Sequence, residues 1–396
     1  MTHVKNGFKP RARRLKVGIV ANEFFDEAIG RMGGFGWSVA QVARLFNSRP
    51  ELGIDPIFLT GELRARKGKD EVLTHGTRLI LRPSSKTEYL RRVWSERIDL
   101  LFSLDYRSNY QFVYWSLPRT PLIVWVHDPR TKEDTEKIGT LQIPGANGSP
   151  AQGISAVDCT SLRRVVTMSQ WTGRRVFFAA PALFLREKTE GTYGIKTPDL
   201  GFLPNIVEVE PGQIVKSEQP RVVFLGRLDP IKRPWVFTEM GRHFPHVEFL
   251  FLGKNHFQGE GSWQPNGLPG NVRLLGHVDS AEKIRLLCSA WTLVNTSIHE
   301  ALPISFLEAL ACETPILSCQ NPEDVTSRFG IYVGRWDGTG LEGLPQFVEG
   351  LRRLLDDEPF RRRLGQEGRR WVQTHHSGGH FVEAFREMCR RAGVQQ

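Results

Sequence analysis

The chain has 396 residues, more than one hydrophobic core usually holds, so its length predicts two domains. Hydrophobic residues make up 40% of it and charged residues 24%, which is typical of a soluble globular protein. The five cysteines form no CxxC pair, which argues against a zinc site or a disulfide framework and favours a reducing, cytoplasmic compartment. No apolar run approaches the ~18 residues that span a bilayer, and we expect no signal peptide and no metal.

The formal net charge of +10 leaves three readings open. The basic residues form a solvated surface, they attract an anionic membrane surface or a phosphorylated substrate, or they bind nucleic acid. The sequence has no recognition-helix, zinc-finger or RRM-type signature, so we expect no nucleic-acid partner. A position at the inner face of the membrane, with peripheral contact to anionic lipid, stays open.

Short apolar strands alternate with amphipathic helices through the first half of the chain. The first strand is "LKVGIVAN" (15–22), and the helix after it carries Val39, Val42, Ala43 and Phe46 at helical spacing. This alternation predicts a parallel sheet covered by helices on both faces. Further strands are expected at 55–61, 78–83, 98–104, 121–128 and 163–169, the last leading into a helix that opens near Gln170.

The pattern changes at 198–220, where prolines and the lack of a helical period predict a linker. The alternation then restarts and ends in a basic helical tail. The sequence therefore predicts two Rossmann-like βαβ domains, 1–200 and 201–375, facing each other across a deep cleft, with a helix at 376–396 crossing back to the first. Strands are expected at 221–228, 247–253, 272–276, 291–297 and 314–319, and helices at 235–243, from about 280, after 303 and from about 341.

Two carboxylates flank the expected start of one helix, in "NTSIHEALPISFLEALACETPIL" (295–317). Pro303 suits the first helical position, which places Glu300 in the preceding loop and Glu308 about a turn inside the helix. The free N–H groups of Ile304 and Ser305 would point out of the helix start, where phosphate binds well. Carboxylates beside it can accept hydrogen bonds from sugar hydroxyls. The alternative is that each glutamate simply complements the helix dipole on a solvated face.

Two cations follow an expected strand in "VVFLGRLDPIKRPW" (222–235). The strand ends at Gly226. Arg227 and Lys232 lie five residues apart in the loop, where they can clamp a diphosphate, Arg through a planar fork and Lys as a point charge. An ordinary basic turn is the competing interpretation.

Two further features are weaker. In "RMGGFGWSV" (31–39), Gly33, Gly34 and Gly36 let the backbone approach a phosphate or sugar closely, although GxGxxG spacing is absent and a structural turn explains them as well. His127 and Asp128 end a strand inside the expected cleft. A neutral histidine there can bind a hydroxyl, or it is satisfied by local backbone.

Together these motifs stand in the order and at the spacing of one family: the sequence resembles the family-4 retaining glycosyltransferases of the GT-B fold. The resemblance covers nearly the whole chain and is strongest over 222–318. Its most specific element is Glu300-x7-Glu308 followed by Ala309, with Pro315 closing the next turn. "PNIVE" (204–208) resembles the family's Pro-Asn signature, and "VTMSQWTGRRV" (166–176) resembles its Ser-containing strand-to-helix turn.

The resemblance implies roles for the candidate residues. Arg227 and Lys232 would hold the donor diphosphate and stabilise the leaving group, Glu300 would bind the donor sugar, Glu308 the ribose, and His127 the sugar near the reacting carbon. The expected catalytic residues are His127, Arg227, Lys232 and Glu300. The expected donor-binding residues are Gly33, Gly34, Gly226, Arg227, Lys232, Val278, Glu300, Ala301, Leu302, Ile304, Ser305 and Glu308, with Gly276 and Val278 lining the nucleobase pocket.

The resemblance further implies retention of anomeric configuration, with the acceptor attacking from the face that the phosphate leaves and with no protein nucleophile. Two protein cations and a helix dipole can stabilise the leaving diphosphate without a metal ion. We expect no cofactor beyond the nucleoside-diphosphate sugar, which serves as donor substrate. Two departures stand out: Ala301 and Glu313 replace glycines that the family usually has. A non-glycine residue in a left-handed conformation at 313 would cost ~1 kcal/mol.

Three functions stay open. The leading one is transfer of a hexose-type unit from a nucleoside diphosphate to a glycan or lipid-linked acceptor in polysaccharide biosynthesis. The acceptor would lie on the N-terminal domain, for which Asn22–Arg31 and Leu63–Asp70 are candidates. The second is a nucleotide-sugar epimerase on the same fold, although only His127 offers acid–base chemistry. The third is a non-catalytic, membrane-peripheral protein of glycan assembly.

Overall fold

The computed structural model describes residues 13–29, 33–64, 70–145, 159–208, 213–257, 263 and 267–394. Internal contacts group the chain into two compact units that alternate along the sequence. The first unit is Met1–Val124, Arg164–Phe177 and Arg386–Gln396, and the second is Trp125–Arg163 and Phe178–Phe385. The predicted division at 200/201, the cleft and the returning helix at 376–396 stay predictions. Of the candidate acceptor segments, 30–31 and 65–69 lie outside the described residues.

The first sheet has eight strands in the order β3-β4-β2-β1-β5-β6-β7-β8. Strand β1 pairs in parallel with both β2 and β5, whereas β3 runs antiparallel to β4 as a short edge hairpin. The strands are β1 Leu15–Val20, β2 Ile54–Arg64, β3 Glu71–Thr74, β4 Thr77–Arg82, β5 Leu100–Leu104, β6 Leu122–Trp125, β7 Val176–Ala180 and β8 Gly201–Phe202. Buried strands of this kind read as continuous apolar runs, as β5 and β6 do.

The second sheet is parallel, with six strands in the order β11-β10-β9-β12-β13-β14. Its strands are β9 Arg221–Leu225, β10 Glu248–Leu252, β11 Val272–Leu274, β12 Thr292–Asn295, β13 Ile316–Ser318 and β14 Gly330–Tyr332. The chain winds outward from β9 in one direction and from β12 in the other. The order therefore reverses between β9 and β12, where open α/β sheets bind ligands beyond the carboxyl ends of their strands.

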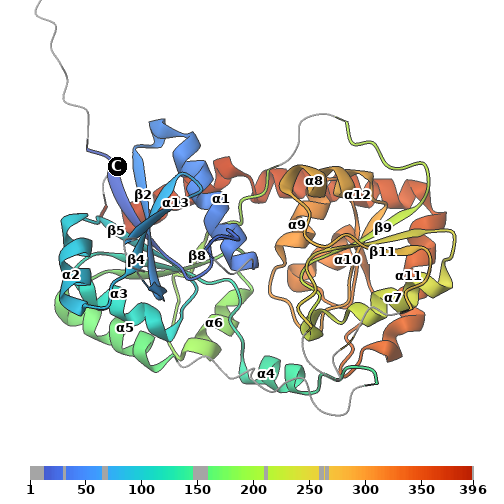
Figure 1. Ribbon diagram of the computed structural model, residues 1–396, viewed down its shortest axis with the longest axis horizontal. Helices are drawn as coiled ribbons and strands as arrows, with labels where there is room; N and C mark the ends of the chain where they lie inside the picture. The colour runs from blue at the N-terminus through green and yellow to red at the C-terminus, as the bar shows by residue number, and fades with distance from the viewer. Residues whose placement is uncertain are drawn as a thin grey trace, which may run out of the picture. The chain divides into compact units, whose positions relative to one another are not determined.

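Helices cover both faces of the second sheet: α7 and α11 lie on one side and α8 and α9 on the other (Figure 1). The α-helices are α1 Gly34–Ser48, α2 Lys86–Ser95, α3 Gln111–Ser116, α4 Lys132–Gly139, α5 Thr160–Thr172, α6 Leu185–Tyr193, α7 Pro234–His243, α8 Ser280–Ser289, α9 Ile304–Ala311, α10 Val325–Phe329, α11 Leu344–Asp356, α12 Glu358–His375 and α13 Gly378–Arg391. The short 3-10 helices are η1 Pro50–Leu52, η2 Ser108–Tyr110, η3 Pro230–Lys232, η4 Pro322–Asp324 and η5 Leu341–Gly343.

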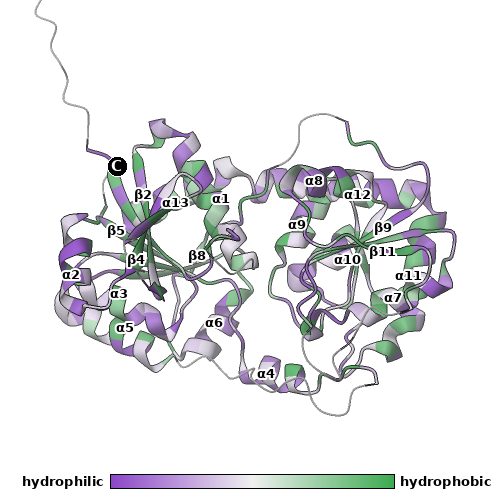
Figure 2. Ribbon diagram, in the orientation of Figure 1, coloured by the Kyte–Doolittle hydropathy of each residue, from purple (hydrophilic) through white to green (hydrophobic). Residues whose placement is uncertain are grey.

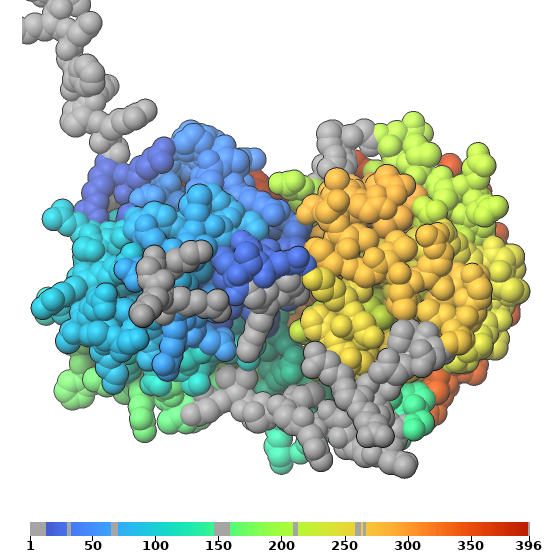
Figure 3. Space-filling model, in the orientation of Figure 1, coloured from blue at the N-terminus to red at the C-terminus, as the bar shows by residue number. Residues whose placement is uncertain are grey.

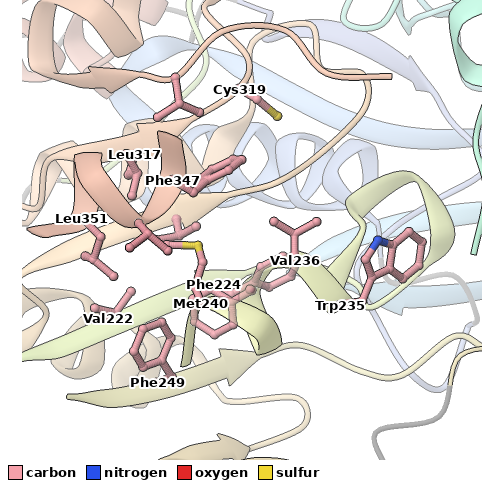
Figure 4. Packing of buried hydrophobic residues seen from close by; sticks show 14 of the residues in the cluster. Val222, Phe224, Trp235, Val236, Met240, Phe249, Leu317, Cys319, Phe347 and Leu351 are labelled. Atoms are coloured by element: carbon pink, nitrogen blue, oxygen red, sulfur yellow. The ribbon is translucent and has the colours of Figure 1, made fainter. Parts of the chain in front are cut away.

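The core of the second unit forms where its strands meet α7 and α11. Phe224 and Phe251 from neighbouring strands have ring centroids 5.1 Å apart, and Met240 of α7 and Leu351 of α11 are fully buried against them (Figure 4). The strands are mostly apolar, whereas the helices carry both apolar and polar residues (Figure 2). A sheet that is buried on both faces requires such apolar strands. Their packing against the helices holds in place the strand ends that carry the site.

The structure corrects several expectations. "RRVVTMS" (163–169) is not a strand but part of helix α5, because Leu162, Val165 and Ser169 are buried at helical spacing. No helix therefore opens at Gln170, and the resemblance of 166–176 to a strand-to-helix turn fails. The expected linker at 198–220 contains β8 of the first sheet, and Pro303 is the N-cap of α9 rather than its first residue.

Candidate functional site

The candidate site lies at the reversal point of the second sheet. Lys232 ends the short helix η3, which follows β9, and Glu300 lies in the loop between β12 and α9. Because β9 and β12 are adjacent parallel strands, their carboxyl ends meet at one edge of the sheet.

Lys232 and Glu300 form an ion pair there, between the Lys232 ammonium and Glu300 Oε1. The same oxygen accepts hydrogen bonds from Asn295 Nδ2 at 2.9 Å and from Ser297 Oγ at 2.6 Å. The Glu300 side chain is only 10% exposed. A nearly buried carboxylate with three donors on one oxygen is fixed in position, and its other oxygen is the one that remains for a ligand.

These contacts also set the charge of Glu300. Burial alone would raise the pKa of this carboxyl, but the charge of Lys232 and the hydrogen bonds from Lys232, Ser297 and Asn295 outweigh burial and hold the pKa below its usual value. Glu300 is therefore ionised at neutral pH and accepts hydrogen bonds rather than donating them.

A buried arginine that sequence reasoning missed holds the two loops together. Arg233 has a left-handed backbone (φ 46°) and donates from Nε to Thr296 O at 2.7 Å and from Nη1 to Trp336 O at 2.8 Å. In return Thr296 Oγ1 donates to Lys232 O at 2.7 Å. Hydrogen bonds of Arg233 and Thr296 thus join the loop that carries Lys232 to the loop that carries Glu300. Nothing in the sequence indicates that Arg233 is buried, because it follows Lys232 in a turn that is already basic.

The other predicted cation, Arg227, is more exposed than Lys232. Arg227 is 52% exposed and its nearest anionic partner is Asp229, at 3.4 Å. Asp229 caps η3 by accepting from Lys232 N at 3.1 Å. Gly226, which precedes Arg227, has φ 151°, a backbone conformation that favours glycine. A Cβ on Gly253 would lie 1.9 Å from Gly226 O, so the close approach of the two backbone segments requires glycine at 253.

The second predicted glutamate has a different partner. Glu308 Oε1 accepts from Lys283 Nζ of α8 at 2.5 Å, and both side chains are nearly buried. Glu308 and Glu300 lie on the same segment, one within α9 and one before it. Ala301 and Leu302 are buried in the loop before α9, while Ile304 and Ser305 open the helix and are half-buried. The first amides of any helix lack intrahelical acceptors, which leaves them available to an anion.

His127 is buried beyond the end of β6, and burial lowers its pKa to about 3, so it is neutral at physiological pH. Its neighbour Asp128 accepts from His299 Nε2 at 2.9 Å, and His299 directly precedes Glu300. His299 Nδ1 also lies 3.4 Å from Asp134 Oδ1. Burial lowers the pKa of His299, but these two carboxylates prevail and raise it. The sequence did not predict a role for His299, because its partners Asp128 and Asp134 are far from it along the chain.

The predicted glycines of the first unit begin α1. Gly33 is its N-cap, and a Cβ there would lie 2.3 Å from Glu23 Oε2, while a Cβ on Gly36 would lie 2.6 Å from Phe25 N. Nothing lies within 4 Å of a Cβ on Gly34. Contact with backbone therefore explains Gly36, whereas a Cβ on Gly33 would meet only the movable end of the Glu23 side chain, so local packing strictly requires neither Gly33 nor Gly34.

Two other predicted features are seen in the second unit. Val278 is half-buried in the loop between β11 and α8, and Gly276 before it has φ 69° and accepts from Gly253 N at 2.7 Å. Glu313, after α9, is left-handed (φ 53°), so the substitution noted in the sequence does impose a non-glycine residue on such a conformation. The described residues contain no group of three or more His, Cys, Asp or Glu side chains arranged to hold a metal.

The fold is of the kind seen in solved GT-B glycosyltransferase structures, with two Rossmann-like α/β sheets. Over residues 208–371 the chain matches the family "Glycosyl transferases group 1", a region that contains the second sheet together with Lys232, Glu300 and Glu308. A curated relative, "Glycosyltransferase 1 domain-containing protein 1" of Xenopus tropicalis, is 24% identical over 106 residues. That match covers 27% of this chain and 30% of the relative's length.

Solved structures are similar over nearly the whole chain. Sucrose-phosphate synthase from Thermosynechococcus elongatus has a TM-score of 0.69 at 15% identity, covering 96% of this chain and 99% of that one. A glycosyltransferase from Rickettsia africae has a TM-score of 0.64 at 12% identity, covering 97% of this chain and 100% of that one. WaaG, a glycosyltransferase involved in lipopolysaccharide biosynthesis, has a TM-score of 0.59 at 13% identity, covering 95% of this chain and 99% of that one. The predicted GT-B fold is confirmed, and the domain match supports the predicted class of enzyme, a glycosyltransferase.

No α-helix among the described residues is long and apolar enough to cross a bilayer.

Proposed function

We propose that this chain is a retaining glycosyltransferase that moves a sugar from a nucleoside diphosphate to a glycan or lipid-linked acceptor. The observation that carries the proposal is the Lys232–Glu300 pair at the reversal point of the second sheet. It combines a cation for the diphosphate with a fixed, ionised acceptor for sugar hydroxyls, at the edge where such sheets bind nucleotides.

Charge supplies the mechanism. Cleavage of the sugar–phosphate bond builds positive charge on the sugar and negative charge on the leaving diphosphate. Lys232 stabilises the diphosphate, and Arg227, half exposed on the same loop, has the freedom to add a second cation. The start of α9 offers backbone amides to the same charge. These groups make the reaction independent of a divalent ion in this proposal.

Glu300 and His127 act on the sugar. Glu300 presents its second carboxylate oxygen to donor hydroxyls, and neutral His127 offers a hydrogen bond near the reacting carbon without adding charge. We propose that configuration is retained. Because no side chain is assigned as nucleophile, retention requires the acceptor to attack from the face that the diphosphate leaves. Glycan or lipid-linked acceptors are proposed because WaaG, a structural neighbour, belongs to lipopolysaccharide biosynthesis.

The test begins with donor binding and ends with product. Thermal-shift screening of uridine, guanosine, adenosine and cytidine diphosphates and their sugars identifies the donor, because a bound ligand stabilises the fold by mass action. Incubation of that donor with glycan and lipid-linked acceptors, with EDTA added, is expected to give an anomerically retained product by NMR. An epimerised donor formed without acceptor, or no stabilisation by any nucleotide, would overturn the proposal.

A further inference from the structure

A second ion pair in the same unit connects α8 to α9. Lys283 is the fourth residue of α8, and its Nζ lies 2.5 Å from Glu308 Oε1. The side chains are 11% and 13% exposed, respectively. This pair therefore differs from the exposed pair Lys196–Glu190 of the same unit, in which the lysine is 89% exposed.

Lys283 occupies an unusual place for a lysine. Leu286 and Leu287, three and four residues later on α8, are buried, so Lys283 lies on the face of the helix that packs inward. An apolar residue is the ordinary occupant of such a face. A nearly buried ammonium is retained only where specific partners compensate its lost hydration, and Glu308 is such a partner.

The bond leaves half of the Glu308 carboxylate available. Lys283 holds Oε1, whereas Oε2 makes no hydrogen bond to any of the residues that the structure describes. A carboxylate anchored through one oxygen presents the other in a fixed direction, which suits recognition of a hydroxyl.

The loop that leads into α8 is the segment expected to face the nucleobase. Gly276 and Val278 precede α8, which begins after the N-cap Asp279, whose side chain accepts from Glu282 N at 2.8 Å. Only four residues lie between Val278 and Lys283, and the N-terminus of α8 is capped between them. The gold-orange segment that includes α8 lies on the face in view in Figure 3. A shift of α8 would therefore move the base-facing loop and the anchor of Glu308 together.

We propose that Lys283 is a positioning residue that fixes Glu308 for recognition of the donor's ribose hydroxyls. This inference rests on the proposed function, because it requires a ribonucleotide donor. Lys283 does not touch the nucleotide; it acts through the carboxylate. Its role is thus discrimination between ribose and deoxyribose rather than attraction of phosphate.

The experiment measures that discrimination directly. Isothermal titration gives Kd for the preferred ribonucleoside diphosphate and for its 2′-deoxy and 3′-deoxy counterparts. The wild type is expected to prefer the ribonucleotide over at least one of them by about tenfold, the effect of a lost charge-assisted hydrogen bond. Lys283→Met is expected to reduce the preference to about twofold, and Lys283→Arg to retain most of it. The ratio is independent of the fraction of protein that is folded.

Two further variants separate positioning from a structural role. Glu308→Gln is expected to lose the preference by itself, and Lys283→Met added to it is expected to change the ratio no further, because both changes act on one carboxylate. Lys196→Met removes the exposed lysine of the other pair and is expected to leave both Kd values unchanged.

Each outcome has one meaning. A Lys283→Met protein that keeps the wild-type preference overturns the inference and leaves the proposed function standing. A variant that weakens ribo- and deoxyribonucleotides equally shows that Lys283 serves the phosphates or the fold, which also overturns it. Absence of nucleotide binding in the wild type contradicts the proposed function itself.

Discussion

Lys232 and Glu300 are 68 residues apart in the sequence, yet the ammonium of one contacts the carboxylate of the other. The contact exists because β9 and β12 are neighbours in the sheet and each side chain follows the end of its strand. Each charge lowers the cost of burying the other. A donor diphosphate approaching Lys232 would meet a cation already held in place, which is the form of preorganisation that favours charge stabilisation in a transition state.

Replacing Lys232 by Met is expected to reduce the transfer rate by about 100-fold or more, because the cation that stabilises the leaving diphosphate is lost. Folding should survive, since Asn295 and Ser297 still donate to Glu300. Initial rates with the identified donor and thermal unfolding of the same sample check both parts. Lys132→Met, which removes a lysine that is 91% exposed, is the control and should behave as wild type. A Lys232→Met enzyme with near-normal rates would contradict the assigned role.

Arg233 is expected to be a stability determinant. Arg233→Met leaves the carbonyls of Thr296 and Trp336 without their buried donor and should lower the free energy of unfolding by about 3 kcal/mol or more. Chemical denaturation measures the loss. Arg242→Met, at a site 51% exposed, should change the unfolding free energy by no more than ~0.5 kcal/mol. Equal stability of the two variants would refute the view that Arg233 ties the loops.

Gly34 and Gly36 should respond in opposite ways to alanine. A Cβ on Gly36 meets the backbone of Phe25, so Gly36→Ala is expected to destabilise the protein by about 1–3 kcal/mol. Gly34→Ala, with open space around its Cβ and a helical position, should be neutral or slightly stabilising. If Gly34 is kept for close approach of the donor, its alanine variant binds nucleotide more weakly while melting normally. Unchanged affinity would remove Gly34 from the donor-binding set.

His376 is expected to make the fold sensitive to acid. Burial lowers its pKa to about 3, and the charges of His375 and His380 act in the same direction. Because the unfolded state takes up the proton near pH 6.5 and the folded state only near pH 3, stability present above pH 6.5 is lost as the pH falls through this window. Between pH 7 and pH 5 the loss amounts to about 2 kcal/mol for one such histidine.

His376→Phe should therefore show a smaller fall in unfolding free energy from pH 7 to pH 5 than the wild type does, measured by urea denaturation at both pH values. His127 has the same sign, so part of the slope remains. His299 has the opposite sign: its raised pKa contributes stability below pH 6.5 that is lost as the pH rises through the folded value. A His376→Phe slope identical to that of the wild type would argue against a depressed pKa at this residue.

The sequence by itself determined the two α/β sheets and the loops in which the candidate residues lie. Apolar runs and helical spacing are local properties, so β1, β9, β12 and α7 follow from the sequence near each of them. Local reading failed at α5, where a β-branched run favours a strand, but the buried positions Leu162, Val165 and Ser169 follow helical spacing. There the packing of one face overrode the intrinsic preference of the residues.

Only the tertiary structure decided which charges meet. Glu300 and Glu308 look like a matched pair in the sequence, yet one is bound by Lys232 from the loop after β9 and the other by Lys283 from α8. The buried contacts of Arg233 are equally absent from the sequence. Partners of this kind depend on the order of strands in the sheet and on which helices pack side by side, and these relationships join residues that no local pattern connects.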